Sequence, residues 1–499
     1  MTKARNLSDL LDGNGDVKSA NLDNVPASDD ASALTTGTLP AARIGASSIT
    51  VDKMNLGAST DGLSLPRGTT AQQPTATASN EGAIRYDTDD NVLYYANGTE
   101  WLKVSAIIPT ITGITGTILP TIANSITLAG TGFLSSNLVV TFTPSGGSDS
   151  AVTVTPTSDT AATVAVPSAI YGQSSGTSIA IKVANSDGGQ SVATNTTVGS
   201  LPSGGTITNS GNFRIHTFTS SGTFTNTVAN LTGQYLVIAG GGGGGSTDGQ
   251  QDDTGGAGGG GAGGYRCSVP SESSGGGASA ESTTTFGASN YTITVGAGGS
   301  GGTGTNNNSG SQQGTNGNNS SISGTGVSIT STGGGGGGKT DTQSYAGNSG
   351  GSGGGAGGHG TSSSSGGAGT SGQGFAGANT TASHGGGGGG AGEAGGTDDS
   401  AGDGSPFDGG DGVASSITGS SVTRAGGGSS EQGGGGATGV AGDGGGGTSA
   451  QRNVSNATAG SANTGGGGGA GADSNNSSEV NGANGGSGIV IIRYDTTTL

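Results

Sequence analysis

The stretch with the clearest potential for chemistry is "STGGGGGGKT", residues 331–340. Gly333, Gly338, Lys339 and Thr340 satisfy the spacing G-x-x-x-x-G-K-[ST], in which backbone amides and a lysine cradle a phosphate. Such a loop follows a strand and opens a helix. "GVSIT" before it can form a short strand, but "DTQSYAGNSGGSGGG" after it is too rich in glycine for a helix. We therefore expect no nucleotide site, and an exposed Lys339 where a loop begins.

Other candidate reactive groups are isolated. His359 and His384 have no nearby cysteine or acidic partner for a metal. "GDGSPFDGGDG", residues 402–412, carries Asp403, Asp408 and Asp411 and resembles calcium-binding repeats, but their nine-residue period is missing. Cys267, the only cysteine, has no nearby basic residue. We predict no metal, no cofactor and no enzymatic activity, although a glycosidase carboxylate pair without a local motif stays an alternative.

Bulky side chains within polar, glycine-rich stretches are the candidates for binding. They are Tyr265, Arg266, Tyr345, Phe375, Phe407, Arg424 and Arg452. Aromatic residues and arginine dominate contact energies at interfaces, and aromatic faces suit sugars. We predict receptor contacts at these positions; the alternative is that the side chains pack on the ends or sides of the glycine-rich structure.

Composition excludes several classes of protein. The chain has 499 residues, a net charge of −18 and 115 glycines, 95 of them after residue 200. Collagen is excluded because this part lacks a three-residue glycine period and abundant proline. With only 15 Lys+Arg there is no basic stripe, so we expect no nucleic-acid partner. The sequence shows neither a secretory signal nor an apolar run of membrane-spanning length, yet its composition is typical of extracellular proteins, which suggests a virus particle released by lysis.

Repeated glycine runs fill the region between two apolar strands, predicted at 235–239 and 489–494. Ordering one residue costs roughly 1–2 kcal/mol, whereas one hydrogen bond returns about 0.5–1.5 kcal/mol, so an ordered array needs nearly every amide and carbonyl paired. A helix with three residues per turn points these groups outward to its neighbours. We predict short parallel rods with loops at both ends; the alternative is a flexible linker.

The first two hundred residues divide into three predicted regions. Residues 1–66 carry scattered apolar residues that fit either an intertwined multi-chain shaft or a disordered linker. Residues 67–105 contain turn signals at 89–91 and 97–98 between strand-like runs, which predict a small β-meander. Residues 106–200 carry six or seven short β-rich runs, which predict a β-sandwich. The predicted core of the meander is Tyr86, Leu93, Tyr95 and Trp101.

Several segments resemble bacteriophage tail-fibre proteins. "MTKARNLSDLLDGNGDV" is similar to their particle-anchoring ends, "TTGTLPAARIGASSIT" to their shafts, and "GAIRYDTDD…W" to a recurring β-module. The order "ITLAGTGF … VTF … VAVP … IKVANSDGGQSV" resembles the IPT/TIG immunoglobulin-like family, which implies a spacer. "HTFTSSGTFT … YLVIAGGGGGG … GGSGIVIIRY" resembles the glycine-rich domain of phage fibre adhesins, where stacked polyglycine II helices carry host-recognising loops.

Together these inferences predict a mostly β, multidomain, elongated fibre with a β-sandwich and a domain of polyglycine helices, residues 201–499. The resemblance implies a homotrimeric virion protein that contacts tail or baseplate proteins through its N-terminus. Its C-terminal region is expected to bind a bacterial surface glycan or outer-membrane protein. The alternatives are a purely structural fibre or decoration filament, and an enzyme that depolymerises surface polysaccharide.

Overall fold

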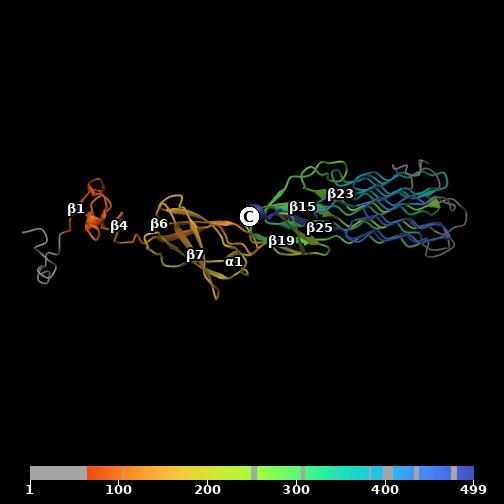
Figure 1. Ribbon diagram of the computed structural model, residues 1–499. Helices are drawn as coiled ribbons and strands as arrows, with labels where there is room; N and C mark the ends of the chain where they lie inside the picture. Colours follow the sequence, from red (N-terminus) through yellow and green to blue (C-terminus); the bar gives the residue numbers. More distant parts are fainter. Residues whose placement is uncertain are drawn as a thin grey trace, which may run out of the picture. The chain divides into compact units, whose positions relative to one another are not determined.

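The computed structural model describes residues 65–104, 106–248, 255–304, 310–341, 343–380, 384–396, 408–431, 438–473 and 480–499. The chain divides into two compact units, Met1–Ser105 and Ala106–Leu499. Nearly all the regular structure in the described residues is β-strand, as predicted (Figure 1). The anchoring and shaft region predicted at 1–66 lies outside the described residues up to position 64.

The first unit contains a small sheet with the strand order β1-β2-β3-β4. Its elements are β1 (Arg67–Gly68), η6 (Thr70–Gln72), η7 (Ala78–Asn80), β2 (Ile84–Asp87), β3 (Val92–Ala96) and β4 (Trp101–Lys103). The meander predicted from the two turn signals is confirmed, and Asn91 and Gly98 adopt the positive φ angles that these turns require. The core assignment is wrong for the single chain, since Tyr86, Leu93 and Trp101 are only half-buried and Tyr95 is 39% exposed.

The second unit begins with two facing sheets that enclose one apolar core. One sheet consists of β5 (Thr110–Thr115), β6 (Ser125–Thr131) and β9 (Ala161–Ala165). The other has the order β11 (Thr194–Thr197), β10 (Ser178–Ala184), β7 (Leu138–Pro144), β8 (Ser150–Val154). Alternate residues of the central strands, such as Leu128, Phe142 and Ile181, are fully buried in this core, beside the short helix α1 (Ser168–Tyr171). The predicted β-sandwich is confirmed.

Two further sheets form the base of the glycine-rich region. The first contains β12 (Thr206–Ser210), β13 (Phe213–Phe218), β25 (Ile489–Asp495), β15 (Leu231–Ile238), β17 (Tyr265–Cys267) and β18 (Thr284–Phe286). The second contains β14 (Gly222–Asn226), β19 (Ser289–Thr294), β20 (Ser320–Gly324) and β21 (Val327–Ser331). Short pairs join β16 (Gly255–Gly256) to β22 (Gly358–His359) and β23 (Val413–Ser415) to β24 (Val422–Arg424), and η8 (Thr496–Thr498) follows β25.

The opening and closing strands of the glycine-rich region lie side by side. β15 and β25 pair antiparallel along their whole overlap, from Gln234–Arg493 to Ile238–Ile489. One face of this pair joins an aromatic cluster that includes Phe224, Phe286 and Tyr291, and the other face packs on a second apolar cluster. These strands therefore anchor the point where the glycine-rich chain leaves and returns.

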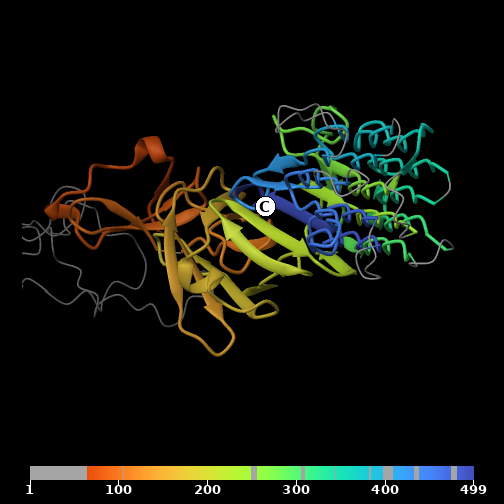
Figure 2. The ribbon, with the colours of Figure 1, turned by 90° about the vertical axis from the view of Figure 1, so that its right-hand side faces the viewer.

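Beyond the strands the glycine runs form rods, by which we mean extended segments bonded to one another through their backbones (Figures 1 and 2). The rod 239–248 continues β15, and its amides donate with a period of three residues. Gly240 and Gly243 donate to Asn318 and Thr315. Gly241 and Gly244 donate to Gly486 and Ala483, and Gly242 and Gly245 donate to Gly261 and Gly258. Successive amides thus point to three different neighbours.

The carbonyl groups of the same rod serve three other segments. Gly240 and Gly243 accept from Gly334 and Gly337, Gly241 and Gly244 from Gly299 and Gly302, and Gly242 and Gly245 from Gly468 and Gly471. The residue numbers of these three donor segments rise along the rod, so the segments run parallel to it. The numbers of the three segments that accept from the rod fall, so those segments run antiparallel to it. The prediction of parallel rods is therefore wrong in part: the array mixes both directions, because the chain reverses between successive rods.

Close spacing explains the need for glycine. A Cβ atom added to Gly242 would overlap the carbonyl oxygen of Gly335, and one added to Gly244 would overlap that of Gly469, both well inside 3.0 Å. The overlapping atoms are backbone, so no side-chain rotation relieves the clash. Glycine is required here to let neighbouring backbones approach, as in other close-packed chains.

Candidate functional site

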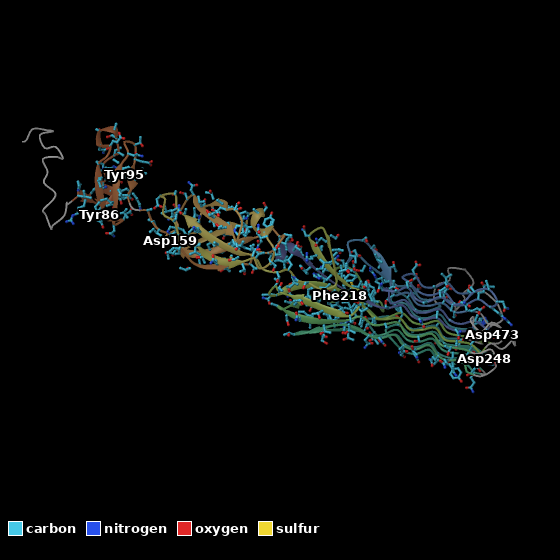
Figure 3. All side chains as sticks on the ribbon, turned by 90° about the horizontal axis from the view of Figure 1, so that it is seen from below. Tyr86, Tyr95, Asp159, Phe218, Asp248 and Asp473 are labelled. Carbon is cyan, nitrogen blue, oxygen red and sulfur yellow. The ribbon has the colours of Figure 1, made fainter. Side chains whose placement is uncertain are left out.

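The array has two ends with different chemistry. We call the end at β15 and β25 the base, and the opposite end of the rods the distal end. Asp248 and Asp473 mark the distal end in Figure 3, far from Phe218 at the base. The described residues at the distal end include Lys339–Asp341, Gln343–Tyr345, Gly358–Ser362, Thr380, His384, Glu431, Thr438 and Gln451–Ser455.

A structured hairpin follows the rod 332–339. Thr340 bridges Ser344, Tyr345 bridges Gly357, and the Thr340 amide donates to the Ser246 carbonyl at 3.1 Å. Lys339 Nζ lies 3.0 Å from Asp341 Oδ2 and 4.3 Å from the centre of the Tyr345 ring. The pair raises the pKa of Lys339 against the opposing effect of partial burial. Lys339 is therefore held in a cluster, and the prediction of an exposed side chain is wrong, since only 25% of it is exposed.

The glycine amides of the phosphate-loop pattern are already hydrogen-bonded within the array. Gly334, Gly335, Gly337 and Gly338 donate to carbonyl groups of other rods. Gly333 and Gly336 donate to the side-chain oxygens of Asn319 and Asn316 at 2.9 and 3.0 Å. Each of the six amides of the run is used, and the run continues into a bridged hairpin instead of a helix. Nothing remains to bind a phosphate, and the predicted strand "GVSIT" is confirmed as β21.

A second distal hairpin carries Arg452. Gln451 bridges Ser455, and Asn453 takes the positive φ of 54° that closes the turn. The Arg452 amide donates to Oε1 of the buried Glu431 at 3.0 Å, and Val454 at the tip is 69% exposed. Arg452 could be predicted from its residue type, whereas Glu431 and Val454 could not. Their only sequence signal is position, since each lies just beyond the end of a rod.

The two histidines of the glycine-rich region also lie at this end. His359 in β22 pairs with Gly255, and the backbone of His384 lies against the neighbouring Gly256. Burial lowers the pKa of His384. Within the described ranges, no group of three or more His, Cys, Asp or Glu side chains is placed to hold a metal. Asp403 lies outside the described residues, while Asp408 and Asp411 each accept a backbone amide, from Val440 and Asp443, at 2.6 Å.

Four of the predicted contact residues lie at the base instead. Tyr265 and Arg266 belong to the strand β17 and Arg424 to the strand β24, so these three do not lie in loops. Tyr265 has no exposed surface and Arg424 is 8% exposed. Phe375 is half-buried, with its ring tip near Gly277 at the base. Only Tyr345 and Arg452 lie at the distal end, and Phe407 lies outside the described residues.

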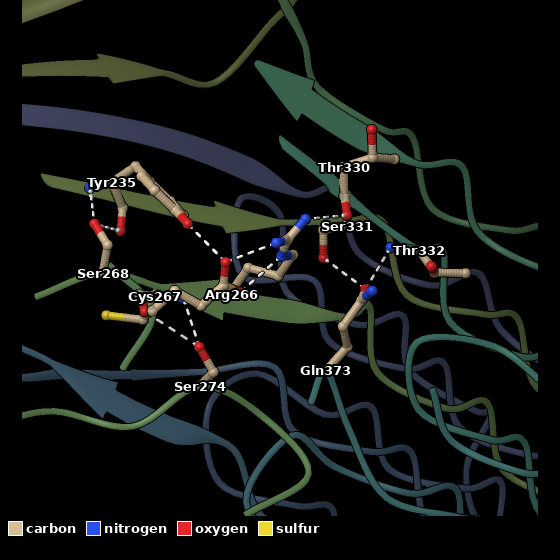
Figure 4. A network of polar contacts seen from close by, with 10 residues as sticks. Tyr235, Arg266, Cys267, Ser268, Ser274, Thr330, Ser331, Thr332 and Gln373 are labelled. Atoms are coloured by element: carbon tan, nitrogen blue, oxygen red, sulfur yellow. Dashed lines mark hydrogen bonds and ion pairs between the residues drawn. The ribbon is translucent and has the colours of Figure 1, made fainter. Parts of the chain in front are cut away.

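Arg266 is fixed by a polar network where strands become rods (Figure 4). Its Nε and NH2 atoms donate to the two carboxylate oxygens of Glu281 at 2.7 and 2.6 Å, and NH1 donates to the Thr330 carbonyl at 3.1 Å. Tyr235 donates its hydroxyl to the same carboxylate at 2.6 Å. Burial opposes the shift, but the hydrogen bonds from Arg266 and Tyr235 lower the pKa of Glu281. The geometry is that of a strong bidentate clamp.

A hollow beside this network is lined by two glutamates. Glu272 and Glu281 both line a cavity of about 620 Å³. Although burial alone would raise the pKa of Glu272, hydrogen bonds from Ser415 and Ser416 lower it, and the pKa of Glu281 is lowered as well. A glycosidase needs one carboxyl group with a raised pKa as its general acid. This pair lacks one, so it does not fit that chemistry.

Comparison with known proteins identifies the class. Residues 219–495 match the glycine-rich domain family, and the chain belongs to that family. Residues 43–122 match the phage tail-like trimerisation region, which indicates a homotrimer and fits a structural protein of a phage tail fibre. No curated protein matches the chain. Among the described residues, no helix is long and apolar enough to cross a membrane.

A solved structure of the chicken CNTN1 FN1-FN3 domains is also similar, at 14% identity and a TM-score of 0.15. The similarity covers 30% of this chain and 56% of that one, so this chain spans little more than half the length of that structure. At this level of similarity it supports no argument about function.

Proposed function

We propose that this protein is a trimeric phage tail-fibre protein that binds a bacterial surface glycan or outer-membrane protein through the hairpins at the distal end. Its N-terminal region would contact tail or baseplate proteins in the virion, and the sandwich at 106–200 would act as an IPT/TIG-like spacer. The rods would be polyglycine II helices, an assignment supported by the three-residue period of their hydrogen bonds.

One observation carries the proposal: the rods use their backbone groups on one another and project polar hairpins at one end. In the run 333–338, for example, every amide already donates to another segment, so none is left for a ligand. The distal hairpins offer an aromatic ring, a lysine, an arginine and an exposed valine: Tyr345, Lys339, Arg452 and Val454. Tyrosine and arginine are enriched among the contact residues that dominate interface energies, so Tyr345 and Arg452 are the main candidates.

The test is binding of the purified full-length chain to a panel of whole bacterial strains. We expect saturable binding to a restricted set of strains and a loss of at least tenfold in affinity for the double variant Tyr345→Ala/Arg452→Ala. Val422→Ser is the control, because Val422 is exposed at the base, in β24. Binding to every strain alike, or to none, would favour the purely structural fibre, and release of sugar fragments from the cells would favour the depolymerase.

A further inference from the structure

In the sheet of the first unit the charged face is buried and the apolar face is exposed, which is the opposite of an ordinary small domain. Residues directly opposite each other on neighbouring strands share a face, so the register assigns every side chain. Ile84, Tyr95 and Leu102 form one row across three strands, and Tyr86 with Leu93 forms the next. We call this apolar set the open face. Arg85, Asp87 and Trp101 belong to the opposite face.

The charged face is the one that the chain covers. Arg85 is 5% exposed and Asp87 is fully buried, beneath the segment 66–80. Arg85 NH2 donates to the Thr69 carbonyl at 3.1 Å and Thr70 Oγ1 donates to Asp87 Oδ1 at 3.1 Å. Trp101 Nε1 donates to the Pro74 carbonyl at 2.7 Å. Thr69, Thr70 and Pro74 of the segment before β2 are therefore committed to the charged face.

The open face retains its apolar exposure. Ile84 is 43% exposed and Tyr95, its direct partner across the strands, is 39% exposed. Tyr86, Leu93 and Leu102 are half-buried at most. Val104, whose amide donates to the Leu93 carbonyl, is 49% exposed beside them. A contiguous apolar patch on a sheet this small marks an interaction surface, because a sheet of a few short strands needs packing on one face to be stable.

We propose that the open face is the surface through which three copies of this chain contact one another. The trimerisation region matched at 43–122 contains every residue of the open face. In a closed ring of three, each copy presents the same patch, so the three patches can meet around one axis. Arg67 of the edge strand β1 pairs with Tyr86 and is exposed, so one charged side chain lies at the border of this face. The named apolar residues themselves carry no charge, so they can be desolvated against one another. The inference rests on the homotrimer but not on receptor binding.

Cysteine cross-linking of the full-length chain tests the contact directly. The only native cysteine, Cys267, is buried, so the background is low. We expect Tyr95→Cys to form disulfide-linked dimers between copies under mild oxidation, at a yield that does not fall on tenfold dilution. The matched control is Ala71→Cys, exposed in η6 on the segment that covers the charged face, and it should remain uncross-linked. Equal yields from the two variants would overturn the proposal.

The mass of the assembly gives an independent readout. We expect Tyr95→Glu to convert the trimer to a monomer in native mass spectrometry, while Ala71→Glu leaves it trimeric. Trp101 is the only tryptophan and lies on the opposite face, so an unchanged emission spectrum shows that the module of Tyr95→Glu is still folded. A Tyr95→Glu variant that stays trimeric would overturn the proposal that the open face is the contact, but not the homotrimer. Another part of the chain would then cover the open face. A monomeric wild-type chain would instead overturn the homotrimer itself.

Discussion

Ile238 and Ile489 pair directly across β15 and β25, although the whole glycine array separates them in the sequence. The array therefore closes on itself at its base, and its two apolar strands pack on both faces: against an aromatic cluster on one side and a second apolar cluster on the other. Disturbing this pair should loosen the rods at their common origin.

Ile491→Ala tests the closure at the base. Ile491 is fully buried and pairs with Leu236, so the variant removes packed methyl groups and leaves a cavity. We expect the free energy of unfolding to fall by about 2–5 kcal/mol. Chemical denaturation followed by circular dichroism measures the change. Ile207→Ala, at a position 37% exposed in β12, should cost far less, and equal losses would contradict the role of the strand pair.

Gly244→Ala tests the close spacing of the rods. Its Cβ would overlap the carbonyl oxygen of Gly469, so neighbouring backbones must separate and several hydrogen bonds must lengthen. We expect a loss of more than about 3 kcal/mol, or failure to obtain soluble protein. The control Gly326→Ala, at a φ of +73° with open space around it, should cost about 1–2 kcal/mol from backbone strain alone. Thermal unfolding compares the two, and tolerance of Gly244→Ala would contradict the packing.

His216 should make the base sensitive to acid. Burial lowers its pKa from the ordinary 6.5 to about 4, while the Gly204 carbonyl at 2.8 Å from Nδ1 opposes the shift. The unfolded chain therefore binds more protons between pH 6.5 and pH 4, so stability falls as the pH falls through this window. The full effect is about 3 kcal/mol. His216→Phe should flatten this part of the stability–pH curve, and a curve of unchanged slope would exclude His216 as its source.

Arg266→Ala separates the two interpretations of the arginines. Breaking the clamp leaves a half-buried Glu281 carboxylate with fewer donors, so we expect a loss of about 1–3 kcal/mol in unfolding free energy. Because Arg266 lies at the base, binding to bacterial cells should be unchanged at temperatures where the variant is folded. Arg452→Ala should show the opposite pattern, with weaker binding and little change in stability. Loss of binding in Arg266→Ala alone would move the contact surface to the base.

Several elements could be predicted from sequence because their signals are local. The turns around Asn91 and Gly98 identify the meander, alternation identifies the strands of the sandwich, and apolar runs identify β15 and β25. The three-residue period of the rods follows from the need to pair every backbone group. What could not be predicted is which rods are neighbours, since glycine has no side chain through which partners could be specified.

The candidate site was predictable only in part. Tyr265 follows a long glycine run and has no alternating neighbours, so nothing in the sequence reveals that it belongs to a three-residue strand inside the core. Tyr345 and Arg452 could be predicted as candidates from their residue types. That both lie at the same end of the array could not be predicted, because it depends on the direction of each rod. In the meander, alternation predicted the strands, but not that the charged face is the covered one.

Because the hydrogen bonds repeat every three residues, the partner of each amide depends on how many residues precede it in the rod. Successive amides of a rod donate to three different neighbours in turn. Inserting a single glycine between Gly241 and Gly244 would therefore turn every later amide toward the wrong partner. Insertion of three residues restores the correspondence, and insertion within a hairpin such as Gln451–Ser455 does not disturb it at all. Hairpins at the distal end can therefore vary in length freely, whereas the rods can change length only by multiples of three residues, so the hairpins can diversify while the rods stay constant.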